Sequence, residues 1–437
     1  MDVKRTGARQ SPFMEQKTVS LSAYWRLLRT NRNYRRLWFA QIVSEIGDWL
    51  YTLSVYSLIL EYTGSAQSVS MAFVCQVLPQ VFASPAAGVL ADRISRRSVM
   101  IVADWARAAI VTAMMLVRSA DMVWLLYVLL TLETVFWAMF EPARSAVIPN
   151  ITSEDERAAG NALGALTWSV NFMLGFAVGG VVAAVVGRQM VFVINGLSFA
   201  LSGLIVRSIR FTEPHLEGTP PLRLKDLLDF KPVLEGFRYV KRDSRMLSTA
   251  LVKCGLGLMG ANWTLLPLLG EKVFPLRIAG ADAKKAGMLG MSLLMACRGF
   301  GAILGPLIGG YIAGNNVKRL RWGILVGFLL AAAGYGLLGM ATTLGWACAA
   351  VMVAHCGGSI IWVFSTTMLQ EMTDDKFRGR IFASEFACSM VSMTAVNTLA
   401  GSLADHGTPI LTIATWTGLI MLLPAAAWLY AQRHWRA

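Results

Sequence analysis

The stretch GVLADRISRR, residues 88–97, ends a long apolar run with one aspartate and three arginines in close succession. Such a cluster stands out because only 15% of the 437 residues are charged, whereas 55% are hydrophobic. Soluble proteins carry about 25% charged residues. The deficit indicates that much of the protein surface faces lipid, and that the charges at 88–97 mark the end of a membrane span.

Apolar segments long enough to cross a bilayer recur along the whole chain. A hydrocarbon core of about 30 Å needs roughly 20 mostly apolar residues in a helix. The sequence therefore predicts an all-α integral membrane protein with both chain ends on the same side. Its twelve predicted spans are Leu37–Leu60, Ser68–Leu90, Val99–Val117, Met122–Ile148, Ala162–Val186, Met190–Val206, Leu247–Leu269, Met288–Ala313, Trp322–Met340, Leu344–Leu369, Ile381–Leu403 and Pro409–Tyr430.

Basic residues indicate how these spans are oriented. They gather in alternate loops, whereas the loops at 62–67, 341–345 and 405–409 contain neither lysine nor arginine. An excess of lysine and arginine marks the cytoplasmic side, so both termini are predicted to be cytoplasmic and the protein to lie in the plasma membrane, the inner membrane of a bacterium. The loop after the seventh span, with Lys272 and Lys284, is an exception. Because the net charge of +14 is mostly an orientation signal, nucleic-acid binding is not expected.

A polar stretch with several prolines divides the chain near its middle. The predicted organisation is a cytoplasmic tail at 1–36, a six-helix bundle at 37–208, a cytoplasmic linker at 209–246, a second six-helix bundle at 247–431 and a tail at 432–437. The first tail lacks the apolar core of a signal peptide. Within the linker, apolar residues at 223–240 follow helical spacing, which favours an amphipathic helix on the membrane surface over a flexible tether.

The two halves repeat one pattern at an offset of 221 residues. Pro85 and Gly88 correspond to Pro306 and Gly309, and TSEDERAAGNA at 152–162 corresponds to TDDKFRGRIFA at 373–383. Internal repeats of this kind are characteristic of secondary transporters, which rock one half against the other around a central site.

On these residues the sequence resembles the major facilitator superfamily. The signature of that family between its second and third helices is G-x-L-A-D-R-x-G-R-R/K, which 88–97 matches except for Ser95 at the second glycine. Residues 31–51, 161–163 and 366–383 look like its branch of drug and siderophore exporters, which includes macrolide efflux pumps and enterobactin exporters. The resemblance covers nearly the whole chain. It implies twelve helices in two six-helix pseudo-repeats, the major facilitator fold, in a monomeric protein.

The same resemblance implies a gate on the cytoplasmic side. In the family, the signature aspartate and arginine latch the two halves together when the central site faces outward, a role that falls here to Asp92 and Arg93. Gly88 is expected to let its helix approach a neighbour closely, because it has no side chain. The full set of predicted gating residues is Gly88, Asp92, Arg93, Arg96, Arg97, Arg378 and Arg380.

Ionisable residues at bilayer depth are candidates for function, since a charge there is costly unless it faces a partner or a cavity. Two pairs stand three residues apart on one helix face, Asp104 with Arg107 and Glu141 with Arg144, which favours local ion pairs over a transport role. Arg298 is a further candidate for an intramembrane ion pair. Lys253, His355 and Glu385 also lie within predicted spans.

Glu133 differs because it lies halfway along its span with no cation near it in sequence. Desolvation favours the neutral, protonated form of such a carboxyl group, which suits a proton carrier. Glu133 is therefore a candidate for proton coupling or substrate contact, with a hydrogen-bonded or paired structural role as the alternative. Asp48 and Glu45, on one face of the first span, are the next candidates.

The resemblance also implies that a proton gradient supplies the energy. No GxxxxGK[ST] motif is present, so ATP is not expected to drive transport and no cofactor is predicted. Two features depart from related antiporters. An early arginine in the fourth helix is absent, and Phe176 replaces the proline of their G-P-x-x-G-G motif, whose intact form occurs at 305–310 instead.

We therefore expect a transporter that exports a small amphipathic organic molecule, a siderophore or a drug-like compound, by alternating access and proton antiport. A lysophospholipid flippase or a metabolite uptake transporter of the same superfamily is the alternative. An enzyme is not expected, because the four histidines form no catalytic or metal-binding pattern. The six cysteines stand singly in apolar runs, which predicts neither a zinc site nor a disulfide framework.

Overall fold

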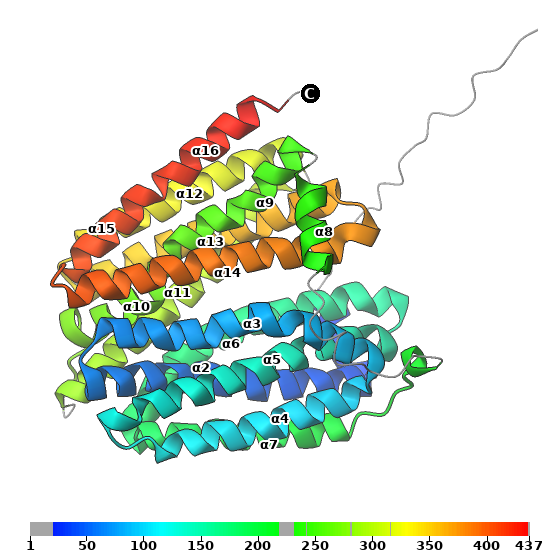
Figure 1. Cartoon of the computed structure of the whole chain (residues 1–437), viewed down its shortest axis with the longest axis horizontal. Helices are drawn as coiled ribbons and strands as arrows, with labels where there is room; N and C mark the ends of the chain where they lie inside the picture. The colour runs from blue at the N-terminus through cyan, green and yellow to red at the C-terminus, as the bar shows by residue number, and fades with distance from the viewer. Residues whose placement is uncertain (1–20, 218–230, 242, 280–281, 315, 436–437) are drawn as a thin grey trace, which may run out of the picture.

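Long helices lie side by side in the computed structural model, which describes residues 21–217, 231–241, 243–279, 282–314 and 316–435 (Figure 1). Within these ranges the chain forms helices and no strand. The long helices of the first half are α2 (Arg32–Thr63), α3 (Ala66–Arg93), α4 (Arg96–Ala113), α5 (Val123–Ile151), α6 (Glu154–Val186) and α7 (Arg188–Arg207). The second half contains α9 (Ser244–Gly257), α10 (Asn262–Leu268), α11 (Ala283–Ala313), α12 (Val317–Gly339), α13 (Leu344–Met372), α14 (Asp375–Asp405), α15 (Ile410–Ile420) and α16 (Leu422–Arg433).

Ten of the twelve predicted spans each coincide with one of these helices, whereas the seventh falls on α9 and α10 and the twelfth on α15 and α16. In the described part of the chain, ten helices are long and apolar enough to cross a membrane. The segments that fall short of this criterion are α2, which carries charges inside its span, and the region 244–273, which is broken into short pieces. The all-α membrane fold is confirmed, and spanning by these two segments stays a prediction.

The repeat seen in the sequence is also present in the helix boundaries. Shifted by 221 residues, α5 covers the same range as α13, and the first residue of α6 falls on the first residue of α14. A local signal marks the start of one helix in each half. Side chains of Thr343 and Ser153 accept a hydrogen bond from the backbone at the N-termini of α13 and α6, as helix caps do. The two halves thus share one pattern of helix starts.

The seventh predicted span is not one continuous helix. A short 3₁₀ turn (Leu258–Ala261) follows α9, and a π-helical turn (Leu269–Val273) follows α10. Glycine and proline account for this, because Gly260 lies so close to the backbone of Met393 on α14 that a Cβ would stand 2.4 Å from its carbonyl oxygen. Pro267 in α10 cannot donate a helical hydrogen bond.

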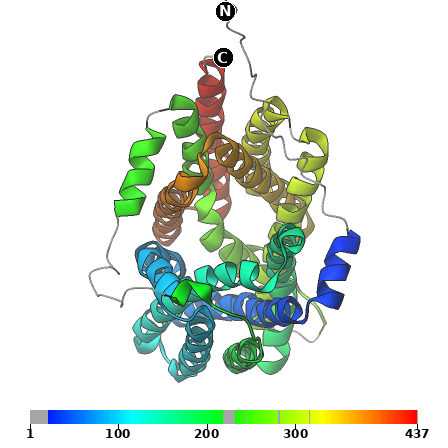
Figure 2. The ribbon, with the colours of Figure 1, turned by 90° about the vertical axis from the view of Figure 1, so that its right-hand side faces the viewer.

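The two halves are joined at the end of the molecule that carries the α2–α3 turn, which we call the closed end. There, Asp405 of α14 accepts hydrogen bonds from Ser65 Oγ (2.5 Å) and from the backbone N–H of Ala66 (2.7 Å). Lys284 donates to Glu61 at 2.7 Å. Deeper, Ser292 Oγ of α11 donates to the carbonyl oxygen of Phe176 of α6 at 2.6 Å. Figure 2 looks along the helices from the opposite end, where they stand around a central axis.

Two short helices lie at that opposite end. They are α1 (Leu21–Thr30) and α8 (Lys231–Val240). The predicted amphipathic helix of the linker is therefore present over 231–240, whereas 223–230 lies outside the described residues, as do 1–20 of the first tail. Arg380 of α14 pairs with Glu235 of α8 at 2.6 Å, which attaches this helix to the second half.

Candidate functional site

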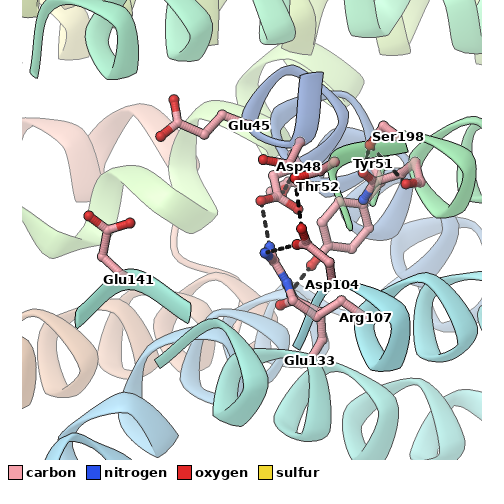
Figure 3. A network of polar contacts seen from close by, with 12 residues as sticks. Glu45, Asp48, Tyr51, Thr52, Asp104, Arg107, Glu133, Glu141 and Ser198 are labelled. Atoms are coloured by element: carbon pink, nitrogen blue, oxygen red, sulfur yellow. Dashed lines mark hydrogen bonds and ion pairs between the residues drawn. The ribbon is translucent and has the colours of Figure 1, made fainter. Parts of the chain in front are cut away.

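Arg107 stands at the centre of a buried ionic cluster that joins three helices (Figure 3). Its Nη2 donates to Asp48 Oδ2 of α2 at 2.7 Å, and its Nε donates to Glu133 Oε1 of α5 at 2.8 Å. Asp104, on the same helix as Arg107, lies farther away, with 3.9 Å between its Oδ1 and Nη1. We call these four residues the Arg107 cluster.

The geometry corrects two expectations from the sequence. Glu133 is not a lone carboxylate, because Arg107 reaches it from a helix that lies 26 residues away in sequence. The expected pair of Asp104 with Arg107 is the longest of the three contacts, and Asp104 Oδ2 instead accepts a hydrogen bond from Ser202 of α7 at 2.7 Å. Helical spacing finds partners on one helix only, and here the better partners come from neighbouring helices.

Close helix packing places the cluster. A Cβ on Gly47 would lie 2.2 Å from Asn195 Oδ1, so only glycine lets α2 approach α7 this closely. From α7, the ring of Phe199 lies 3.9 Å from the guanidinium carbon of Arg107, in a cation–π contact. Tyr51, one turn after Asp48 on α2, donates a hydrogen bond to Glu133 Oε2 at 3.4 Å. The guanidinium is thus held by three helices and by an aromatic ring on a fourth.

The charges of the cluster do not balance, since three carboxyl groups face one guanidinium. Arg107, Asp104 and Glu133 are buried, whereas the side chain of Asp48 retains 18% exposure. Asp48 Oδ1 has no hydrogen-bond partner in the described structure. Among the three carboxyl groups of the cluster, Asp48 thus has the most exposed side chain.

A second group of polar side chains lies around Glu45, one helical turn before Asp48 on α2. Glu45 accepts hydrogen bonds from Gln41 at 2.8 Å and from Asn171 of α6 at 2.9 Å. The amide oxygen of Gln41 accepts in turn from Arg144 at 3.0 Å, and Arg144 holds Glu141 with two hydrogen bonds of 2.9 and 2.5 Å. The predicted pair of Glu141 with Arg144 is confirmed, and Gln41 connects it to Glu45.

The second half has its own buried ion pair. Lys253 Nζ of α9 lies 2.9 Å from Glu385 Oε2 of α14, and both side chains are almost fully buried. The ring of Trp362 lies 4.3 Å from the same ammonium group. The sequence identified both residues as ionisable at bilayer depth but not as partners, because 132 residues separate them.

Arg298 does not form the ion pair that the sequence predicted. No described carboxylate lies within ion-pair distance of its guanidinium, which stands over two aromatic rings instead. The centroid of Trp263 is 3.9 Å and that of Phe172 4.7 Å from its Cζ. Because these aromatic partners belong to α10 and α6, they could not be predicted from the spacing of residues along α11.

The predicted gating residues lie at the end opposite the closed end. Arg96 donates to the carbonyl oxygens of Ala91 and Ala146, and Arg97 donates to that of Arg207, so both brace the first half internally. Asp92 is exposed. The expected close approach at Gly88 is wrong for this conformation, because a Cβ there would meet nothing within 4 Å. The hydrogen bonds described above between the halves lie at the closed end and between α6 and α11, not at this helix end.

Metal binding finds no support among the described residues, where no three histidine, cysteine, aspartate or glutamate side chains form a group that could hold an ion. The cysteines are free thiols, but two of them lie close to each other. The Sγ atoms of Cys254 and Cys388 lie 2.8 Å apart, between α9 and α14.

Comparisons with known proteins agree with this architecture. The sequence profile of the Major Facilitator Superfamily matches residues 37–281. Tetracycline resistance protein, class C, of Escherichia coli is 26% identical, over 80% of this chain and 82% of its own length. Macrolide efflux protein A of Streptococcus pyogenes is 23% identical, over 85% and 89% respectively. The solved structure of the nucleoside transporter NupG matches with a TM-score of 0.68 at 12% identity, over 92% of this chain and all of that one.

Proposed function

The chain belongs to the major facilitator superfamily, and from this premise we propose that it exports a small amphipathic organic molecule, a drug-like compound or a siderophore, in exchange for protons. The protein is a multi-pass membrane transporter and not an enzyme. Export is favoured because two of its relatives are named for efflux or for drug resistance. The observation that supports proton coupling is the charge imbalance of the Arg107 cluster, in which three carboxyl groups surround one guanidinium.

The cluster can store a proton for electrostatic reasons. One guanidinium neutralises one of its three carboxyl groups, and each further negative charge in a low-dielectric interior is costly. Uptake of a proton by one of the three groups therefore relieves the repulsion among them. We assign the exchange of a proton with water to Asp48, whose side chain is the more exposed, and the anchoring of Arg107 to Glu133.

This assignment links protonation to movement. When a proton neutralises Asp48, its bond to Arg107 weakens, and the guanidinium is then held from α5 by Glu133 alone. The contact between α2 and α4 loosens while that between α4 and α5 persists. Such a change within the first half can shift the equilibrium between the inward-facing and outward-facing conformations of alternating access.

The orientation that completes the proposal places the closed end outside and both termini in the cytoplasm, in a bacterial inner membrane. In this orientation the substrate enters from the cytoplasmic end, opposite the contacts that join the halves. We further propose that the protein works as a monomer, since each chain contains both halves that alternating access requires.

Efflux measurements in a deletion strain test the proposal. Cells expressing the wild type are expected to accumulate less of an exported compound, from a panel of macrolides, tetracyclines and siderophores, and a protonophore is expected to abolish the difference. Asp48→Asn should abolish export against a gradient while substrate counterflow in proteoliposomes persists, because counterflow needs no net proton movement. Glu154→Gln, which changes an exposed acid at the start of α6, is the matched control.

The measurements test proton antiport, the role of Asp48 and the class of substrate separately. Export that survives the protonophore would reject proton antiport, and full export by Asp48→Asn would remove this residue from coupling. If no compound in the panel is exported but labelled lysophospholipid crosses proteoliposomes faster with the protein than without it, the flippase alternative replaces the exporter.

A further inference from the structure

Arg298 is a cation with no carboxylate partner among the described residues, at the boundary between the two halves. It projects from α11 of the second half onto Phe172 of α6, in the first half, and onto Trp263 of α10. The following residue, Gly299, packs so closely against Phe172 and Met173 that a Cβ there would stand 2.8 Å from the Phe172 ring. The guanidinium therefore lies where the two halves touch.

Some of its hydrogen-bond donors lack an acceptor in the described structure. Arg298 Nε and Nη1 are buried and have no acceptor among the described residues. The indole N–H of Trp263, beneath the guanidinium, likewise has none. Two donor nitrogens of one arginine and the indole nitrogen of the adjacent tryptophan thus lack an acceptor in the described structure.

Three other cations within the spans do have carboxylate partners. Arg107 and Arg144 each hold at least one carboxylate at 2.8 Å or less, and Lys253 holds Glu385 at 2.9 Å. The groups that interact electrostatically with Arg298 are the phenols of Tyr56 and Tyr335 and the imidazole of His355, none of which is a carboxylate. The sequence thus supplies a carboxylate to these three cations but not to Arg298.

An unpaired cation at bilayer depth is costly, and a hydrogen-bonded anion offsets that cost better than aromatic rings do. Arginine presents its donors as a planar fork that matches a carboxylate or a phosphate group. Trp263 and Phe172 provide apolar faces beside that fork. Arg298 as a whole is only partly buried, and movement of the halves, which meet at this residue, would uncover its Nε and Nη1 donors for a ligand.

We infer that Arg298 and Trp263 bind the anionic group of the transported substrate, which is an amphipathic acid with one carboxylate or phosphate on an apolar body. This inference rests on the proposed function and narrows its substrate class. Because the fork and the tryptophan belong to the second half and Phe172 to the first, the bound acid contacts both halves.

The test compares one acid with its neutral counterpart. Binding of 2-naphthoate and of 2-naphthamide to the purified full-length protein in detergent is measured by equilibrium dialysis, since the two probes share one aromatic body and differ in charge. The wild type is expected to bind the acid at least tenfold more tightly than the amide. Equal affinities, or no saturable binding of the acid, would overturn the inference.

Variants assign the preference to this site. Arg298→Gln should weaken acid binding at least tenfold and leave amide binding unchanged, so that the two affinities become equal. Trp263→Phe keeps the ring but removes the N–H, and should weaken acid binding severalfold. Arg321→Gln is the matched control, because Arg321 also stands over a tryptophan, Trp435, at 4.3 Å but lies elsewhere, on α12. An acid preference that survives Arg298→Gln would contradict the inference.

Competition identifies the source of the acid. If lysophosphatidylglycerol displaces 2-naphthoate and lysophosphatidylcholine does not, the ligand is the anionic headgroup of a lipid. If neither lipid displaces 2-naphthoate, the ligand is a free organic acid.

Because binding is measured without a gradient, its failure leaves the export measurements unaffected. Conversely, a cell that exports nothing would reject the exporter while the acid site is still measurable.

Discussion

Asp405, the last residue of α14, accepts a hydrogen bond from the backbone N–H of Ala66, the first residue of α3, although the two belong to different halves of the protein. Its carboxylate also accepts from Ser65 Oγ and from the backbone N–H of Gln67 at 3.0 Å. A carboxylate at a helix N-terminus satisfies backbone donors and complements the helix dipole. Here the capping residue comes from across the interface, so the cap can form only while this end is closed.

Removing this cap should favour opening of the closed end. Asp405→Ala is expected to raise severalfold the rate at which a cysteine introduced at Ser70, which is buried against Gly401, reacts with a membrane-impermeant maleimide. The reason is that the substitution removes three hydrogen bonds that join the halves and none within the second half. Asp282→Ala is the control, because Asp282 caps its own helix α11 within one half. Unchanged labelling in Asp405→Ala would show that other contacts hold this end closed.

A larger residue at Gly180 should act in the same direction by steric means. A Cβ at this position of α6 would stand 2.3 Å from the Cβ of Ser292 on α11, closer than any two packed carbon atoms. Gly180→Val is therefore expected to separate the halves at this contact, to increase labelling at Ser70 and to lower export. Gly345→Val is a suitable comparison, because nothing lies within 4 Å of a Cβ there. Normal export by Gly180→Val would mean that this contact is not needed in the transport cycle.

The Arg107 cluster should also contribute strongly to stability. Arg107→Gln leaves three buried or partly buried carboxyl groups without their cation, and breaking a buried ion pair in this way costs about 3–5 kcal/mol. The melting temperature in detergent is expected to fall more than in Asp48→Asn, which removes one acid and leaves Arg107 paired with Glu133. Circular dichroism or differential scanning fluorimetry measures both. A smaller effect for Arg107→Gln than for Asp48→Asn would contradict the central position of the guanidinium.

Much of the fold could be predicted from the sequence, because lipid imposes a simple pattern. Runs of apolar residues and the 221-residue repeat locate the helices, and α5 and α13 begin at equivalent positions of that repeat. The break after Gly257 in the seventh span could not be predicted by hydropathy, which stays high across it. It depends on how closely Gly260 packs against α14, a contact between residues far apart in the chain.

The candidate site was predictable only as a set of residues. Their cost at bilayer depth marks Asp48, Arg107, Glu133 and Arg298 as special, but partners are chosen across helices. Spacing along α4 pairs Arg107 with Asp104, whereas packing brings Asp48 and Glu133 closer. Spacing also gives no reason to distinguish Arg298, whose missing partner is evident only when the neighbouring helices are in place.

The pair of Lys253 with Glu385 allows a test of whether a buried charge serves structure or transport. Glu385→Gln leaves a buried ammonium group beside Trp362 and should lower the melting temperature, since an uncompensated buried charge costs about 3–5 kcal/mol. The double variant Lys253→Met with Glu385→Gln removes both charges and should recover most of the loss. A double variant that is stable and exports normally would identify a structural pair between α9 and α14. If it is stable but exports nothing, the charges themselves take part in transport, and the second half shares the coupling that we assign to Asp48.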